Sequence, residues 1–264
     1  RFNLQGKVAL VSGSTGGIGK QIAVVLAQGG AEVIINGRTQ ERVDQALTSI
    51  TETVPNAKLH GVAANLATVE GVQLVTELFP EVDILINNLG IYSAKKFEDI
   101  TDEEWMNIFE VNVMSGVRLC RIYLPKMKTN GWGRIVFISS ESAINIPVEM
   151  IHYGMTKTAQ IAIARGLAEG TTGTNVTVNS VLVGPTYSEG VETFVSQLAE
   201  QKKTSIEEVE KEFFVTTRPT SIIKRFLTAE EVANLVYYLA TPASSGTNGS
   251  ALRIDGGLLK NCVQ

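Results

Sequence analysis

The chain has 264 residues, 44% of them hydrophobic, and its 23 basic and 27 acidic side chains leave a formal net charge of −4. This is the composition of an ordinary globular protein, and the mild acidity provides no field that would attract a nucleic acid. Only two cysteines and two histidines occur, which excludes a disulfide scaffold and argues against a bound metal.

Short apolar runs alternate with longer helical segments along the whole chain. The expected strands are residues 8–11, 33–35, 59–63, 84–86, 135–138, 176–181 and 251–254. The expected helices between them include residues 18–28, 41–53, 103–128, 156–168 and 229–239. Runs that are apolar at successive positions are typical of parallel strands covered by helices on both faces. We therefore expect an α/β fold, a Rossmann-like doubly wound seven-stranded parallel sheet, in a single domain over residues 1–264.

Residues 187–226 interrupt this alternation. The segment is polar and helical, over residues 191–199 and 205–213, and contains no strand pattern. Ligands bind beyond the carboxyl ends of strands in an open α/β sheet, so an insertion there can close over a substrate. A helical lid is the functional interpretation, and a surface excursion or a subunit contact is an equally good alternative.

A glycine-rich loop follows the first expected strand and opens a helix. It reads Ser12-Gly13-Ser14-Thr15-Gly16-Gly17-Ile18-Gly19. Glycine lets the backbone turn with positive φ and approach a pyrophosphate, whose charge is met by the helix N-terminus. The spacing differs from the common G-x-G-x-x-G pattern, so the strand-turn-helix context carries the prediction. The expected dinucleotide contacts in this loop are Gly13, Ser14, Thr15, Gly17, Ile18 and Gly19.

The end of the second strand indicates which dinucleotide is used. It reads Asn36-Gly37-Arg38-Thr39, and the first carboxylate after it is Glu41. An acid at the strand end would repel the 2′-phosphate of NADP, whereas a guanidinium can bind it through charge-assisted hydrogen bonds. The sequence therefore favours NADP(H) over NAD(H), with Arg38 as the phosphate contact.

Three side chains suggest proton-transfer chemistry. Tyr153 and Lys157 are four residues apart at the front of a helical segment, so they share one helix face. An ammonium stabilises a phenolate, and Lys157 is expected to lower the pKa of Tyr153. Ser140 ends the fifth strand, where its hydroxyl could bind the substrate oxygen that Tyr153 protonates. A Tyr-x-x-x-Lys pair or a strand-ending serine is common alone, so the combination carries the prediction.

This combination resembles the short-chain dehydrogenase/reductase family in its compact form, and in particular its 3-oxoacyl-carrier-protein reductases and related carbonyl reductases. The resemblance runs from about residue 4 to residue 257. Its motifs, in chain order, are the glycine loop, Asn87-Asn88-Leu89-Gly90, Asn112, Ser140 with Tyr153 and Lys157, and Ile254-Asp255-Gly256-Gly257. The chain departs from the family pattern at Ser12, Asn65, Leu89 and Val183, where the family usually has Thr, Asp, Ala and Pro.

The resemblance implies a role for each matching residue. Tyr153 would be the general acid in carbonyl reduction and Ser140 would orient and polarise the carbonyl. Lys157 would bind the nicotinamide ribose, and Asn112 would hold a water that links the lysine to solvent. Further cofactor contacts are expected at Asn65, Leu66, Asn88, Gly90, Gly184 and Thr186.

The substrate is expected to lie against Ser140, Ser142, Tyr153 and Tyr187. Glu141, Asn145, Ile146 and Thr186 are neighbours in the expected pocket, and His152 is more simply interpreted as a satisfied neighbour of Tyr153. Three functions remain open: an NADPH-dependent reductase of a ketone or 3-oxoacyl compound, an NAD-dependent secondary-alcohol dehydrogenase, and a dinucleotide sensor without chemistry. The intact Ser140, Tyr153 and Lys157 set speaks against the sensor.

The remaining expectations concern location and assembly. No apolar run approaches the roughly 18 residues needed to cross a bilayer, and the first residues lack the plan of an export signal. We expect a cytoplasmic protein that binds a small molecule and no membrane. The resemblance implies pairing through the helices that contain Asn112 and Tyr153, hence a homodimer or homotetramer.

Overall fold

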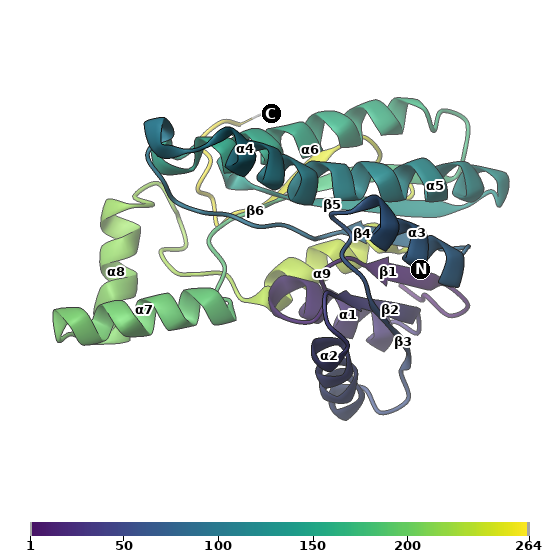
Figure 1. Ribbon diagram of the computed structural model, residues 1–264, viewed down its shortest axis with the longest axis horizontal. Helices are drawn as coiled ribbons and strands as arrows, with labels where there is room; N and C mark the ends of the chain where they lie inside the picture. The colour runs from purple at the N-terminus through teal and green to yellow at the C-terminus, as the bar shows by residue number, and fades with distance from the viewer. Residues whose placement is uncertain (1, 263–264) are drawn as a thin grey trace.

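The seven expected strands form one parallel sheet in the computed structural model, which describes residues 2–262 apart from the side chains of residues 189, 190 and 194 (Figure 1). Its order is β3-β2-β1-β4-β5-β6-β7. The strands are β1 (Val8–Val11), β2 (Glu32–Gly37), β3 (Lys58–Ala63), β4 (Ile84–Asn87), β5 (Gly133–Ser140), β6 (Val176–Val183) and β7 (Ala251–Ile254). The chain winds outward from β1 to β3 and then returns to β4 beside β1, which confirms the doubly wound fold.

Helices cover both faces of this sheet. They are α1 (Gly17–Gln28), α2 (Gln40–Thr53), α3 (Val69–Leu78), α4 (Asp102–Phe109), α5 (Ser115–Thr129), α6 (Ile151–Glu169), α7 (Glu189–Lys202), α8 (Ile206–Thr216) and α9 (Ala229–Ala240). In β1, Ala9 and Val11 pack toward α1 and α9, whereas Leu10 packs toward α3, α5 and α6. Because successive residues of a strand point to opposite faces, two covered faces explain the continuous apolar runs of the sequence.

The long helix expected over residues 103–128 is interrupted. One π-helical turn, Glu110–Met114, separates α4 from α5, and it contains Asn112. A π-helical turn accommodates one extra residue in a helix and is often found at functional sites. The other difference concerns α6, which begins at Ile151 rather than at residue 156 and so includes Tyr153 in its first turn.

A pair of helices, α7 and α8, projects from the carboxyl end of β6 (Figure 1). Buried side chains of both helices pack together with Phe226. The two ends of the segment are held side by side, because the Tyr187 N–H donates to the Leu227 carbonyl and the Leu227 N–H donates to the Pro185 carbonyl, each at 2.8 Å. The expected helical insertion is therefore present, and its two ends are joined by backbone hydrogen bonds beyond the carboxyl end of β6.

Two further observations concern membranes and metals. Within residues 2–262, no helix combines the length and the apolar character that a membrane span requires. Over the same residues, no three His, Cys, Asp or Glu side chains cluster in a way that could hold a metal ion.

Candidate active site

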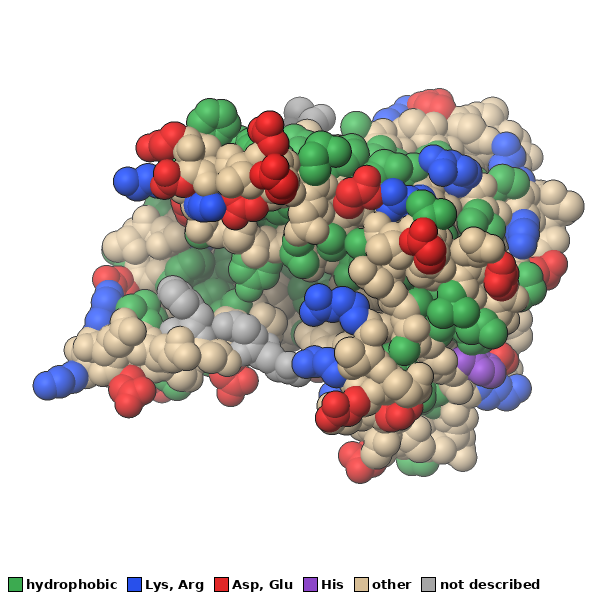
Figure 2. All heavy atoms as spheres, viewed as in Figure 1, with side chains coloured by type: hydrophobic (Ala, Val, Ile, Leu, Met, Phe, Trp, Pro, Cys, Tyr) green, Lys and Arg blue, Asp and Glu red, His purple; other side chains and the backbone are tan. Residues whose placement is uncertain are grey.

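A cleft of about 580 Å³ lies at the carboxyl edge of the sheet. It appears in the space-filling view as the hollow between the α7 segment and the main body (Figure 2). The sequence-predicted residues that line it are Ile18, Asn88, Gly90, Ser140, Glu141, Ser142, Tyr153, Lys157, Gly184 and Thr186. They come from α1, α6 and the segments after β4, β5 and β6, so the fold brings together residues that are far apart in the sequence.

The three proposed proton-transfer side chains meet in this cleft. Ser140 Oγ accepts the Ser142 N–H at 3.1 Å, and Ser140 lies close enough to Tyr153 to oppose the rise in the pKa of that phenol. The Lys157 Nζ lies 5.5 Å from the centre of the Tyr153 ring. This proximity agrees with the expectation from the helical spacing of Tyr153 and Lys157.

The pKa of Tyr153 is raised in the protein alone, so the expected lowering by Lys157 stays a prediction. Burial raises the pKa of Tyr153 to about 12, against the opposing hydrogen bond from Ser140. Burial also lowers the pKa of Lys157 to about 8. Both changes have one cause, because a site poor in water disfavours the charged form of either group. The Tyr153 phenol is therefore held in its protonated form.

Lys157 is held by two oxygen acceptors. Its Nζ donates to the backbone carbonyl of Ile138 at 2.8 Å and to Gln160 Oε1 at 3.3 Å. The Gln160 amide in turn donates to the backbone carbonyl of Asn112 at 2.6 Å. The Asn112 side chain bonds to both backbone groups of Ile91 and makes no hydrogen bond to Lys157. The link from Asn112 to Lys157 thus runs through Gln160, which the sequence did not single out.

The glycine loop has the shape that a pyrophosphate requires. Gly13 and Gly17 have φ values of +62° and +54°, and the N-terminus of α1 carries no side-chain cap. A Cβ atom on Gly17 would meet nothing within 4 Å, so open space lies beside it, whereas one on Gly19 would lie 2.4 Å from Asn88 Nδ2. Gly17 thus leaves room at the helix N-terminus and Gly19 allows close packing. The residues present fit a dinucleotide.

Several predicted cofactor residues have structural roles in this loop. The Asn88 side chain donates to the carbonyls of Ser12 and Gly13, each at 3.0 Å, which fixes the loop to the end of β4. The buried Ser14 hydroxyl donates to a backbone carbonyl of β1 at 2.7 Å. Leu66 lies in the core. The Ser14 and Leu66 side chains therefore face the protein, and only their backbone groups are available to a ligand.

The end of β2 presents one free cation. Arg38 is exposed and has no hydrogen-bond or ion-pair partner among residues 2–262. Gly37 beside it leaves no room for a side chain, since a Cβ would lie 2.4 Å from Thr15 Cγ2. Asn36 points inward and accepts the Gly13 N–H at 3.1 Å, a contact that ties β2 to the glycine loop and that the sequence did not reveal. Asn65, the other expected adenosine contact, is exposed at the end of β3.

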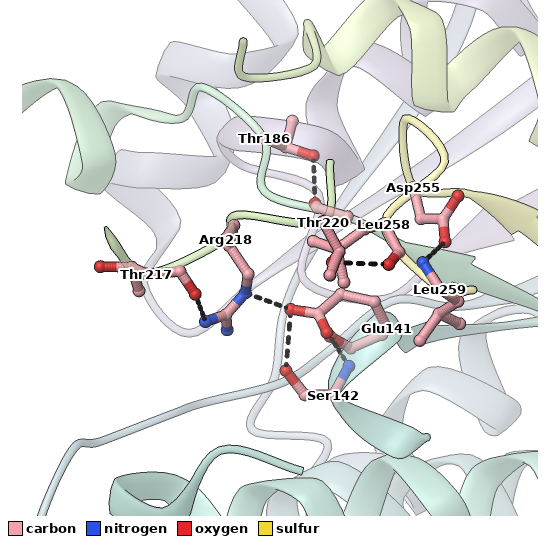
Figure 3. A network of polar contacts seen from close by, with 11 residues as sticks. Glu141, Ser142, Thr186, Thr217, Arg218, Thr220, Asp255, Leu258 and Leu259 are labelled. Carbon is pink, nitrogen blue, oxygen red and sulfur yellow. Dashed lines mark hydrogen bonds and ion pairs between the residues drawn. The ribbon is translucent and has the colours of Figure 1, made fainter. Parts of the chain in front are cut away.

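A buried ion pair connects the segment after β5 with the segment that follows α8 (Figure 3). Glu141, directly after Ser140, is 3% exposed, and its Oε1 accepts from Arg218 Nε at 2.9 Å and from Ser142 Oγ at 3.4 Å. Burial raises the pKa of Glu141, and the positive charge of Arg218 opposes this change. Arg218 lies 77 residues further along the chain, so the sequence provided no signal for the pair.

The structure corrects the expected substrate side of the cleft. Tyr187 does not line the cleft, and its ring packs 5.8 Å from that of Phe226. Asn145 and Ile146 are exposed and also lie outside the cleft lining. His152 is buried, with Nε2 3.0 Å from the Ser93 hydroxyl, but its buried Nδ1 has no hydrogen-bond partner among residues 2–262, so the satisfied-neighbour interpretation holds for only one ring nitrogen.

Comparison with known proteins agrees with this geometry. The family model for short chain dehydrogenase matches residues 7–199. The uncharacterized oxidoreductase YvaG of Bacillus subtilis is 51% identical over 99% of both chains, and the 3-oxoacyl-[acyl-carrier-protein] reductase FabG of Aquifex aeolicus is 33% identical over 97% of this chain and 99% of the relative. The L-sorbose reductase of Gluconobacter frateurii, complexed with NADPH and L-sorbose, superimposes with a TM-score of 0.91 at 30% identity and covers 98% of this chain and 99% of its own. The chain belongs to the short-chain dehydrogenase family and is an oxidoreductase with a dinucleotide cofactor.

Proposed function

We propose that this enzyme reduces a ketone or a 3-oxoacyl compound with NADPH and that Tyr153 is the general acid. The observation that carries the proposal is that Ser140, Tyr153 and Lys157 line one cleft, with the Lys157 Nζ 5.5 Å from the centre of the Tyr153 ring. Two relatives support it, because one is named a 3-oxoacyl reductase and another binds NADPH with a ketose.

Each of the three side chains has a separate task in this mechanism. The nicotinamide, when bound, supplies the hydride. Ser140 donates a hydrogen bond to the carbonyl oxygen and fixes its position beside Tyr153. Tyr153 then gives its proton to the developing alkoxide, a base stronger than a phenolate, so a phenol with a raised pKa still transfers its proton downhill. Lys157 stabilises the phenolate that remains.

The preference for NADP(H) is also part of the proposal. Arg38 is exposed and has no partner in the described part of the chain, and Glu41 is the first acid after β2. The other proposed cofactor contacts are the backbone of the glycine loop with Thr15 and Ile18, together with Asn65, Leu66, Asn88, Gly90, Gly184 and Thr186. Tyr153 and Lys157 would face the nicotinamide ribose. Ser142 is kept as a substrate contact and Tyr187 is not.

Three larger features complete the proposal. Residues 187–226 act as a lid over the cleft, since α7, α8 and the segment after them contribute Val195, Val209 and Arg218 to its lining. The lid belongs to the single domain formed by residues 1–264. The homodimer or homotetramer and the cytosolic location stay predictions from the sequence.

An absorbance assay of nicotinamide oxidation tests the proposal. Purified protein is offered NADPH or NADH with 3-oxoacyl thioesters, cyclic ketones and diketones, and the reverse reaction is tried with secondary alcohols and NADP or NAD. We expect carbonyl reduction that is faster with NADPH and is lost in Tyr153→Phe. Equal or better use of NADH would favour the alcohol dehydrogenase, and cofactor binding without turnover in either direction would favour the sensor.

A further inference from the structure

Gln160 connects two residues that belong to the proposed site. It lies in α6 three residues after Lys157 and is 1% exposed. Its Oε1 accepts from Lys157 Nζ at 3.3 Å, and its Nε2 donates to the Asn112 carbonyl at 2.6 Å. An ammonium can only donate and a carbonyl can only accept, so these two neighbours fix the orientation of the amide. Gln160 therefore directs its amide oxygen to Lys157 and its amide nitrogen to Asn112.

The Asn112 carbonyl that Gln160 binds lies where the helix is interrupted. Asn112 lies in the π-helical turn Glu110–Met114. Such a turn departs from the regular bonding of an α-helix, and the Asn112 carbonyl within it accepts the Gln160 amide. The Asn112 side chain is hydrogen-bonded to the Ile91 backbone and to the Thr156 hydroxyl, so these contacts hold the turn in place without Gln160. Gln160 thus joins a fixed point of one helix to the ammonium of another.

The surroundings of the Lys157 ammonium are neutral apart from one titratable neighbour. β5 contributes the Ile138 carbonyl, the segment after β4 contributes Gly90, whose added Cβ would lie 3.4 Å from Nζ, and α6 itself contributes the Tyr153 phenol. The buried carboxylate of the cleft, Glu141, is paired with Arg218. No carboxylate forms an ion pair with Lys157 among residues 2–262, so hydrogen-bond acceptors alone stabilise its charge.

We propose that Gln160 is a positioning residue: its amide ties the Lys157 ammonium to the Asn112 carbonyl, keeps it beside Tyr153 and favours its charged form. The inference rests on the function proposed above for the catalytic role of Lys157. Two N–H groups of the ammonium are used by Ile138 and Gln160, and the third is left for the phenolate and the cofactor ribose. Without the amide, Lys157 loses an acceptor for its charged form and the Asn112 carbonyl loses its donor.

Two substitutions at this position are expected to act in opposite directions. Gln160→Met keeps the length of the side chain and removes the acceptor, so the pKa of Lys157 should fall by about one pH unit. Gln160→Glu places a carboxylate beside the ammonium, so the pKa of Lys157 should rise by about one pH unit. The wild-type pKa, lowered by burial to about 8, leaves room to observe both changes. A merely structural role would not give opposite signs.

The first measurement needs neither substrate nor cofactor. Lysine labelled with ¹³C at Cε is titrated by NMR in the intact chain, and the Lys157 signal is identified by its absence in Lys157→Met. Thr158→Val is the matched control, because Thr158 lies on the same helix and donates only to the Ala143 and Gly154 carbonyls. An unchanged Lys157 titration in both Gln160 variants, or an equal change in Thr158→Val, overturns the proposal. Thermal unfolding by circular dichroism verifies that each variant is folded.

The second measurement follows kcat for NADPH-dependent reduction of ethyl acetoacetate against pH. The alkaline limb should move to lower pH in Gln160→Met and to higher pH in Gln160→Glu, and kcat near neutrality should fall roughly tenfold in Gln160→Met. If the pKa of Lys157 measured by NMR changes but the alkaline limb of the kcat profile does not, the catalytic part of the proposal is overturned. A wild-type enzyme inactive on this probe would count against the proposed substrate class, and the NMR titration would still decide whether the amide controls Lys157.

Discussion

The hydroxyl of Tyr153 is the proposed source of the proton, and the other two side chains act on it. Tyr153→Phe keeps the ring and removes only the hydroxyl. We expect kcat to fall on the order of 10²-fold or more while NADPH binding persists. Steady-state rates and a fluorescence titration of NADPH measure the two effects separately. Near-normal turnover would remove Tyr153 from its role as the acid.

Arg38 offers an equally local test at the other end of the cofactor site. Its guanidinium is exposed and unpartnered among residues 2–262, so Arg38→Ala removes a cation without breaking an internal contact. We expect the Kd for NADPH to rise about tenfold to a hundredfold and that for NADH to change little, since a charge-assisted hydrogen bond is lost only with the phosphate. Arg121→Ala, at an exposed site on α5, gives the same change in net charge. An equal rise in the Kd for NADPH and for NADH would show that Arg38 does not bind the 2′-phosphate.

At the scale of secondary-structure elements, the strands could be predicted because burial on both faces makes each run continuously apolar. The interruption between α4 and α5 could not, because one extra residue hardly disturbs helical periodicity. The site divides in the same way. Ser140, Tyr153 and Lys157 follow a local motif, whereas the contacts of Gln160 with Asn112 and of Glu141 with Arg218 join distant parts of the chain. Such contacts depend on how the elements pack, which residue spacing does not record.

The Glu141–Arg218 pair gives a prediction about how the helical segment is attached. Arg218→Met would leave the Glu141 carboxylate buried without its cation, so the free energy of unfolding should fall by about 3 kcal/mol. Adding Glu141→Gln should recover much of this loss, because the buried charge is removed. Urea unfolding at neutral pH measures all three proteins.

The control for this experiment is a second arginine in the same part of the chain. Arg225 pairs with Glu231 at 2.8 Å, and the two side chains are 50% and 36% exposed, against 11% and 3% for Arg218 and Glu141. Arg225→Met should leave the free energy of unfolding nearly unchanged, since solvent screens an exposed pair. Similar losses at Arg218 and Arg225 would contradict a special role for the buried pair.

For the whole molecule, the buried ammonium of Lys157 should make stability depend on pH. Its pKa is lowered by burial from 10.5 to about 8, so the unfolded chain binds more protons than the folded chain between these values. The free energy of unfolding should therefore rise with pH across that window, and below pH 8 the buried charge costs roughly 3 kcal/mol.

Lys157→Met removes this cost and tests it. We expect the variant to be inactive yet more stable than the wild type at pH 7, by up to roughly 3 kcal/mol, with the gain shrinking as the pH approaches 10.5. Denaturant unfolding at pH 7 and pH 10 provides the comparison, with the exposed Lys211→Met as control. A gain that does not depend on pH would mean that packing, and not the charge, is responsible.

The junction between Thr186 and Leu227 has a consequence for how this enzyme can diversify. Because backbone hydrogen bonds already clamp the two ends together, everything between them behaves as a closed loop, and lengthening or shortening a closed loop changes its entropy only slowly. The excursion can be exchanged for one of another size while the strands beneath it keep their register. If the segment between Thr186 and Leu227 is replaced by the corresponding segment of a relative, the substrate selectivity should change while the fold of the sheet is kept.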